Sequence, residues 1–176
     1  MKDMLPLIEP LIPALRRYAR ALMRDQAAAD DLVQDCLERA ITRWHQRRED
    51  GDARTWMFTI LHNLAINRLR QARRRGAHLS IEDAGELALA RPPSQEDRLR
   101  QRDVLNALES LPEDQRAVLL LVSVEDVSYA QAARILDVPI GTIMSRLSRA
   151  RERLRQAMDG ETERAAGRGP NLRRVK

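Results

Sequence analysis

Polar side chains near the C-terminal end of the chain are spaced in a way that suits contact with DNA. On a helix with about 100° per residue, Ser145, Ser148 and Arg149 point to one side, with Thr142 and Arg146 towards its flanks. The opposite side carries the apolar residues Ile143, Leu147, Ala150 and Leu154. Hydroxyl and guanidinium groups hydrogen-bond to base edges and phosphates, and a helix with one buried face and one such polar face can enter the major groove.

A shorter helix precedes this one, and the pair predicts a helix-turn-helix. Its apolar and small residues recur at i, i+3, i+4 and i+7, as Tyr129, Ala132, Ala133 and Leu136. The run Asp137-Val138-Pro139 ends the pattern, because proline cannot continue a helix interior. An αα-hairpin with a solvated arginine face is the alternative interpretation of this segment.

A second polar stripe lies on a helix expected over residues 54–74. It consists of Thr59, Asn63, Asn67, Arg70 and Arg74, and it ends in the cluster Arg73-Arg74-Arg75. Amides in the middle suit base-edge contacts, and guanidinium groups at the end suit phosphates. The other face is apolar, with Met57, Ile60, Leu61, Leu64 and Ala65. Trp56 and Phe58 lie beside the stripe, where a ring could stack on an unpaired base; for Trp56, packing between helices is the alternative.

Acidic residues gather at the start of a helix expected over about 28–47. They are Asp30, Asp31, Asp35 and Glu38, interleaved with Leu32, Val33, Cys36 and Leu37. Carboxylates in a first turn also stabilise the helix dipole, so a solvated turn over a core stripe is one interpretation. The other is a docking face that offers carboxylates and the amide of Gln34 to a basic protein.

Helical patterns dominate the chain, so we expect an all-α fold of two small helical domains joined by a flexible linker. Residues 76–94 contain glycine, proline and acidic residues with little periodicity, which is typical of a linker. The expected boundaries are a first domain over 1–75, the linker over 76–94, a second domain over 95–158 and a disordered basic tail over 159–176. The first helix is expected over about 13–24, and others begin near Ser94 and Pro112.

The composition favours a polyanionic partner and a reducing compartment. The 176 residues carry a net charge of +5, which favours a polyanionic partner. Only Lys2 and Lys176 are lysines, so almost all basic residues are arginines. The codon usage of a GC-rich genome gives the same excess of arginine, so this excess by itself decides little. Cys36 is the single cysteine, and its apolar surroundings favour a buried side chain over a redox sensor. We recognise no signal peptide and no membrane span, so we expect a cytoplasmic protein without membrane contact of its own.

Four motifs occur in order over roughly residues 10–157, and together they resemble the extracytoplasmic-function (ECF) group of the bacterial sigma-70 family. The motifs are Asp31-Leu32-Val33-Gln34-Asp35; Trp56-Met57-Phe58 followed by His62-Asn63-Leu64-Ala65-Ile66-Asn67; Leu111-Pro112 followed by Arg116; and Ser128-Tyr129 through Val138-Pro139-Ile140-Gly141-Thr142 to Ser145-Arg146 and Arg149-Ala150-Arg151. One departure is Met144, where many members carry Lys or Arg.

The resemblance implies an alternative sigma factor, reduced to regions 2 and 4, that directs promoter recognition and transcription initiation. It implies core RNA polymerase (the β′ and β subunits), promoter DNA and an anti-sigma factor as partners, and no cofactor. Polymerase docking is implied for Asp31, Leu32, Val33, Gln34 and Asp35. Contact with the −10 element is implied for Trp56, Thr59, Asn63, Asn67, Arg70 and Arg74, with Asn63 at a pocket for a flipped base. Contact with the −35 element is implied for Gly141, Thr142, Met144, Ser145, Arg146, Ser148 and Arg149.

Two other classes of function can be weighed on the residues. An autonomous helix-turn-helix regulator would leave the acidic face and the Asn63 stripe without a role, and it should bind its operator tightly without polymerase. A DNA-processing enzyme such as a recombinase is disfavoured. The first 79 residues contain no serine, and their single tyrosine, Tyr18, lies within an ordinary helical stretch. The three histidines lack metal-ligand spacing, so we expect neither a catalytic nor a metal site.

Overall fold

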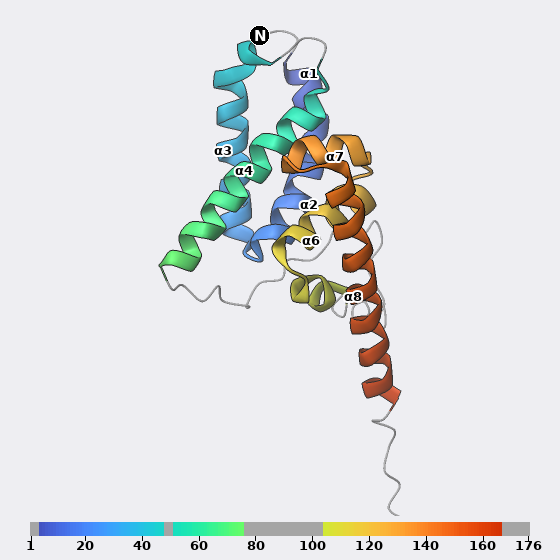
Figure 1. The fold of residues 1–176 in the computed structure, drawn as a ribbon. Coiled ribbons are helices and arrows are strands. Elements are labelled where there is room, and N and C mark those ends of the chain that lie inside the picture. The colour runs from blue at the N-terminus through green and yellow to red at the C-terminus, as the bar shows by residue number, and fades with distance from the viewer. Residues whose placement is uncertain (1–3, 48–50, 76–103, 167–176) are drawn as a thin grey trace, which may run out of the picture.

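The computed structural model describes residues 4–47, 51–75 and 104–166, and within these ranges every regular element is a helix (Figure 1). The first half of the chain contains α1 (Leu5–Ile8), η1 (Glu9–Leu11), α2 (Ile12–Met23), α3 (Gln26–Arg43), η2 (Trp44–Gln46) and α4 (Ala53–Arg74). The second half contains a helical segment over 104–110, α6 (Glu113–Leu119), the π-helical turn η3 (Leu120–Val124), α7 (Tyr129–Leu136) and α8 (Ile140–Ala166). The all-α prediction is confirmed.

Aspartates begin the two long helices of the first half. The carboxylate of Asp25 accepts a hydrogen bond from the Ala28 amide (2.8 Å) at the start of α3. Asp52 accepts from the amides of Arg54 (3.0 Å) and Thr55 (3.1 Å) at the start of α4. Helices α2, α3 and α4 then pack against one another through their apolar faces. The expected core face of α4 is confirmed except for Ile60, which is partly buried.

The helix-turn-helix forms as the spacing predicts. Ser128 and Gln131 make a capping box at the start of α7, and Asp137 ends it in the left-handed conformation (φ 52°). On α8, the predicted apolar stripe faces the core, with Ile143, Leu147 and Ala150 buried. On α7 the most buried large side chain is Ile135, which the predicted stripe did not include.

The structure differs from the predicted boundaries at both ends of the helical body. A short helix, α1, and the 3₁₀ turn η1 precede α2, because Met4 and Ile8 reach the core. Helix α8 continues to Ala166, so the expectation of a disordered tail from residue 159 is wrong up to that point. Five of the eight residues over 159–166 are glutamate, arginine or alanine, which are strong helix formers. The predicted linker, residues 95–103 and the remainder of the predicted tail lie outside the described residues.

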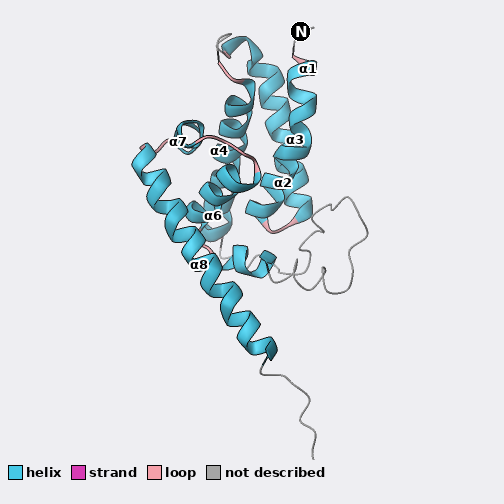
Figure 2. Cartoon of the chain, turned by 90° about the vertical axis from the view of Figure 1, so that its right-hand side faces the viewer, coloured by secondary structure: helices cyan, strands magenta, loops and turns pink. Residues whose placement is uncertain are grey.

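The two halves pack against each other rather than standing apart. Helix α7 lies across α4 in both orientations of the molecule (Figures 1 and 2), and α6 contacts α2. The buried apolar side chains form one continuous core from Met4 to Ala150. Helix α8 runs along the edge of this body and extends beyond it (Figure 1). Among the described helices, none combines the length and the apolar character that crossing a membrane requires.

Candidate nucleic-acid and protein interfaces

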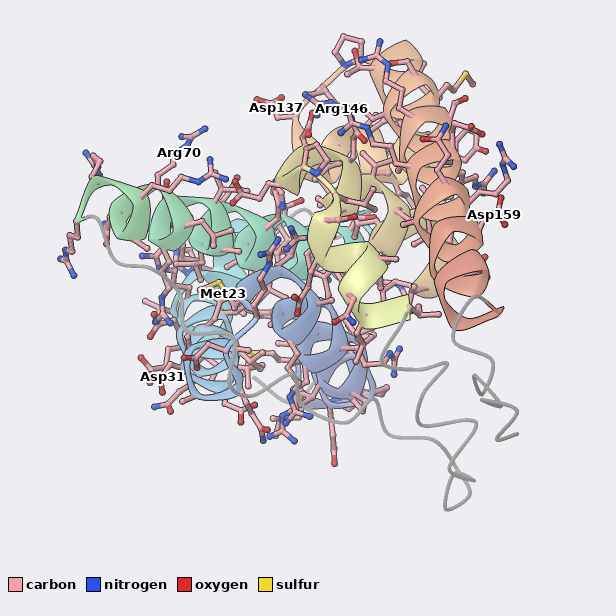
Figure 3. The ribbon with its side chains drawn as sticks, turned by 90° about the horizontal axis from the view of Figure 1, so that it is seen from below. Met23, Asp31, Arg70, Asp137, Arg146 and Asp159 are labelled. Atoms are coloured by element: carbon pink, nitrogen blue, oxygen red, sulfur yellow. The ribbon has the colours of Figure 1, made fainter. Side chains whose placement is uncertain are left out.

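The polar stripe on α4 faces outward along most of its length. Asn63, Asn67, Arg70 and Arg74 are exposed, and Arg70 points away from the body (Figure 3). Thr59 is half-buried, and its hydroxyl donates to the carbonyl of Thr55 (2.8 Å). Four of the five stripe residues are therefore free to contact a ligand, and none of these four has a recorded side-chain partner in the described part of the chain.

The aromatic residues beside this stripe are less exposed than the stacking hypothesis requires. Phe58 is fully buried and meets the ring of Tyr18 edge to face, with 5.4 Å between centroids. Trp56 is half-buried and meets Trp44 edge to face at 5.8 Å. Its packing against Trp44 and the core supports the packing alternative for Trp56.

A basic groove of about 680 Å³ runs beside the stripe, between α3 and α4. Its walls include Asn67, Arg70 and Arg74 from α4, together with Arg39 from α3. Sequence reasoning missed Arg39 because it lies on a helix interpreted only through its acidic residues. Five arginines and one carboxylate, Asp35, line this groove. Arg68 pairs with Asp35 and Arg73 pairs with Glu113, while Arg39, Arg70 and Arg74 leave the potential positive, which suits phosphate groups.

The predicted docking segment on α3 divides into an outer and an inner face. Asp31 and Gln34 are exposed, and Figure 3 shows Asp31 on the side of the molecule away from Arg70. Leu32 and Val33 are buried, so these two side chains anchor α3 and cannot form its outer surface. Asp35 is half-buried and forms an ion pair with Arg68. The carboxylate face available to a partner is therefore narrower than the sequence predicts.

The predicted reading face of α8 is largely exposed. Gly141, Ser148 and Arg149 are exposed, Thr142 and Ser145 are half-exposed, and Met144 is 50% exposed. A Cβ added at Gly141 would meet nothing within 4 Å, so the interior of this protein does not require glycine there. Arg146 differs from its neighbours, because its Nε lies 3.1 Å from Asp114 of α6 and its side chain is 26% exposed.

Several charged residues that sequence reasoning did not single out join the two halves. Both oxygens of Glu125 accept from Arg17 of α2, at 3.1 Å from Nε and 2.8 Å from Nη2. Arg54 of α4 donates to the Glu125 carbonyl oxygen, and its Nη2 lies 3.8 Å from the same carboxylate. The Glu125 side chain is 1% exposed. No local pattern marks these residues, because their partners are 71 and 108 positions away.

The single cysteine is buried, as predicted. The Cys36 thiol lies 3.6 Å from the carbonyl oxygen of Met57, and burial raises its pKa to about 12. A thiol with such a pKa carries almost no thiolate at neutral pH, so it is a poor nucleophile. The hypothesis of a packing role rather than a redox role is supported by this position.

Comparisons with known proteins cover both halves of the chain. Residues 8–62 match the family described as the Sigma2 domain of PhyR, and residues 101–154 match Sigma-70, region 4. The chain is 39% identical over 146 residues to the ECF RNA polymerase sigma factor EcfG of Rhodopseudomonas palustris. The aligned region covers 81% of this chain and 78% of that protein. It is 36% identical over 146 residues to the sigma factor SigM of Mycobacterium tuberculosis, covering 80% and 69%.

A solved structure resembles this one across both halves. It is the sigma factor RpoE in complex with the anti-sigma factor NepR from Bartonella quintana, with a TM-score of 0.72 and 35% sequence identity. The likeness covers 90% of this chain and 98% of that one. The likeness therefore extends over both halves of the chain and is not confined to one of them.

Proposed function

The chain belongs to the ECF group of bacterial RNA polymerase sigma factors, and from this premise we propose how its surfaces share the work of promoter recognition. As a sigma factor it binds core RNA polymerase and directs transcription initiation at specific promoters. We place its action in the cytoplasm, where polymerase and chromosome meet, and in a binding role rather than an enzymatic one.

The exposed stripe on α4 is the proposed contact for the −10 element. Asn63 and Asn67 offer amides that can pair with base edges, while Arg70 and Arg74 reach phosphates. The groove toward Arg39 extends the same positive surface onto α3. This continuous amide and guanidinium surface is the observation that best supports strand binding by the first half.

The outer face of α8 is the proposed contact for the −35 element. Ser145, Ser148 and Arg149 are accessible for the major groove, and Gly141 leaves room for the DNA to approach the start of the helix. Met144 can offer only an apolar contact, such as one to a thymine methyl group. We therefore expect this chain to prefer a −35 sequence different from those of relatives with a basic residue there.

The outer face of α3 is the proposed docking surface for the polymerase β′ subunit. Asp31 and Gln34 project from it, and Asp35 lies at its border in an ion pair with Arg68. Docking here would leave the α4 stripe free, because Figure 3 shows Asp31 and Arg70 on different sides of the molecule. Polymerase and −10 DNA can thus be held at the same time.

One chain can occupy both promoter elements only if its halves separate. Elements named −35 and −10 lie about 25 base pairs apart, or roughly 85 Å of B-DNA. Helix α4 has 22 residues and is about 33 Å long. Because α7 packs directly on α4, the two reading surfaces are too close together in this arrangement. We propose that polymerase binding separates the halves.

The proposed division of surfaces can be tested with purified core polymerase and two short DNA probes. A forked −10 probe should lose binding when Asn67 and Arg70 are replaced by alanine, while a duplex −35 probe should lose binding when Ser145 and Arg149 are replaced. Each variant should keep binding to the other probe and to core. If both variants lose both probes equally, the assignment of one surface to each element is wrong.

A further inference from the structure

Arg116 belongs to a sequence motif that the proposed recognition surfaces do not use, Leu111-Pro112 followed by Arg116. Only 4% of this residue is exposed, and its guanidinium group carries a positive charge at any ordinary pH. The side chain donates to three carbonyl oxygens, from Nε to Leu108 (3.0 Å) and from Nη2 to Glu109 (3.3 Å) and Leu111 (2.9 Å). These neutral acceptors satisfy hydrogen-bond donors without neutralising the buried charge.

A small cavity adjoins Arg116 where α2, α4 and α6 meet, with a volume of about 190 Å³. Its walls combine apolar and charged side chains: Leu22, Leu69, Ala72, Arg24, Arg73, Arg116 and Glu113. A water molecule occupies about 30 Å³ in the liquid, so this space equals roughly six waters. Pockets for organic ligands measure about 300 Å³ or more, which leaves a small polyatomic ion as the fitting occupant. The cavity shares only Arg73 with the groove beside the α4 stripe.

The charges around this cavity do not cancel. Arg73 forms an ion pair with Glu113, and Arg24 donates to the carbonyl oxygen of Glu109. Burial lowers the pKa of Arg116 to about 10, helped by the guanidinium groups of Arg24 and Arg73. The carboxylates of Glu113 and Glu109 act in the opposite direction. Three guanidinium groups against two carboxylates leave an excess of one positive charge, which attracts an anion.

Glu113 adds a condition on which anion can bind. Its Oε1 is buried without a hydrogen-bond partner among the described residues, so the carboxylate retains an unfilled acceptor site. This carboxylate repels a fully ionised anion, whereas an anion with an O–H group can donate to it. Guanidinium groups match the oxygens of phosphate in geometry, and inorganic phosphate keeps at least one P–O–H group at pH 7. We propose that the cavity is a site for inorganic phosphate, held by Arg24, Arg73 and Arg116 and selected through Glu113.

The phosphate site can be tested on the full chain without polymerase or DNA. A ligand that binds only the folded state raises the Tm, so melting is followed at pH 7 in sodium phosphate and in sodium sulfate at equal ionic strength. Sulfate is the matched control: it is also tetrahedral and also stabilises proteins by exclusion from their surface, but it carries no O–H group at this pH. Phosphate should raise the Tm of the parent chain well above the value in sulfate. Calorimetric titration then gives the Kd for each anion.

Two variants should change anion binding in different ways. Arg73→Gln removes one guanidinium group from the wall and should weaken phosphate binding by about tenfold. Glu113→Gln removes the repelling carboxylate at nearly unchanged size, so sulfate binding should tighten by about tenfold and the preference for phosphate should disappear. Arg16→Gln removes the same charge from an exposed position outside the cavity and should bind both anions as the parent does. Arg116 is left unchanged, because it also holds three carbonyl groups.

The outcomes decide between a phosphate site and a general effect of salt. A preference for phosphate that is lost in Glu113→Gln, with weaker phosphate binding in Arg73→Gln but not in Arg16→Gln, would support the site. Equal stabilisation of the parent by phosphate and sulfate, or equal losses in Arg73→Gln and Arg16→Gln, would overturn it. A nucleoside monophosphate has lost most of its P–O–H proton at pH 7, so binding as tight as that of inorganic phosphate would overturn selection through Glu113. None of these results bears on promoter recognition, so the proposed function stands or falls separately.

Discussion

Tyr18 of α2 and His62 of α4 form a buried hydrogen bond, with 3.1 Å between the phenolic oxygen and Nδ1. Burial, helped by the nearby Arg146 guanidinium of α8, lowers the pKa of His62 to about 4. Burial also raises the pKa of Tyr18, so both groups are neutral near pH 7. The first half of the chain thus contains a histidine whose charge state is also influenced by the second half.

This histidine predicts a pH dependence of stability. The folded state keeps His62 neutral down to about pH 4, while the unfolded chain protonates it near pH 6.5. Stability should therefore be full above pH 6.5 and fall as the pH drops from 6.5 towards 4, by on the order of 3 kcal/mol. Urea unfolding of the parent and of His62→Gln at pH 7, 5.5 and 4.5 isolates this contribution. Equal pH slopes for the two proteins would show that His62 does not contribute.

Charge reversal on α3 tests polymerase docking. Asp31→Lys should weaken binding to core polymerase while leaving the melting temperature almost unchanged, because Asp31 is exposed and a surface substitution usually changes stability by no more than about 0.5 kcal/mol. Glu9→Lys makes the same charge change at another exposed position and should bind normally. Core binding measured by competition with a labelled sigma factor checks both. Equal competition by the two variants would contradict the docking assignment.

Replacing Asn63 by alanine tests recognition of a flipped base. The variant should lose selectivity at one base of the −10 element and form open complexes more slowly, because the pocket must offset the few kcal/mol lost when a base leaves the stack. Since Asn63 is exposed, its stability should stay within about 0.5 kcal/mol of the parent. Open-complex formation is followed on promoters that carry each base at every −10 position. Unchanged rates on all of them would remove Asn63 from the site.

The apolar side chain at position 144 should set part of the −35 preference. Met144→Arg introduces a group that can make bidentate contacts to guanine, worth roughly 1–3 kcal/mol of discrimination. A selection from randomised −35 elements should then shift towards guanine at one position. Arg149→Ala serves for comparison: it should reduce transcription, with relaxed preference if it contacts a base and unchanged preference if it contacts a phosphate. Identical preferences of parent and Met144→Arg would place residue 144 outside the reading surface.

Gly141 offers a test in which stability and function move in opposite directions. It lies in the first turn of α8 with open space around it, so Gly141→Ala should stabilise the helix by about 0.5–1 kcal/mol. If DNA approaches the backbone closely here, the added methyl group should weaken −35 binding. Thermal melting and binding to a −35 duplex measure the two effects. A stabilised variant with unchanged DNA affinity would exclude close approach at this residue.

The helices and their outer faces could be predicted because the determinants are local. The stripe Ile143, Leu147, Ala150 and Leu154 repeats at helical spacing, and a proline marks the turn before it. The same reasoning located the exposed amides of α4. For the acidic segment on α3, the interpretation of a solvated turn over a core stripe agrees with the burial of Leu32 and Val33.

The packing of one half on the other could not be predicted in this way. In the sequence, Glu125 is indistinguishable from other acidic residues in turns, and its partners Arg17 and Arg54 are indistinguishable from other surface arginines. Their contacts depend on tertiary packing, for which a single sequence carries no periodic signal. The π-helical turn η3 is equally invisible in the sequence, since the apolar residues Val118, Leu119, Leu121 and Val122 suit an α-helix as well.

Transcription in vitro tests the central claim most directly. Core polymerase is mixed with a genomic promoter library, with and without this protein, and the 5′ ends of the transcripts are sequenced. We predict new start sites that require the protein and share one −35 and one −10 sequence at fixed spacing. Tight, sequence-specific binding of the free protein to DNA, with no new start sites when core polymerase is present, would contradict it.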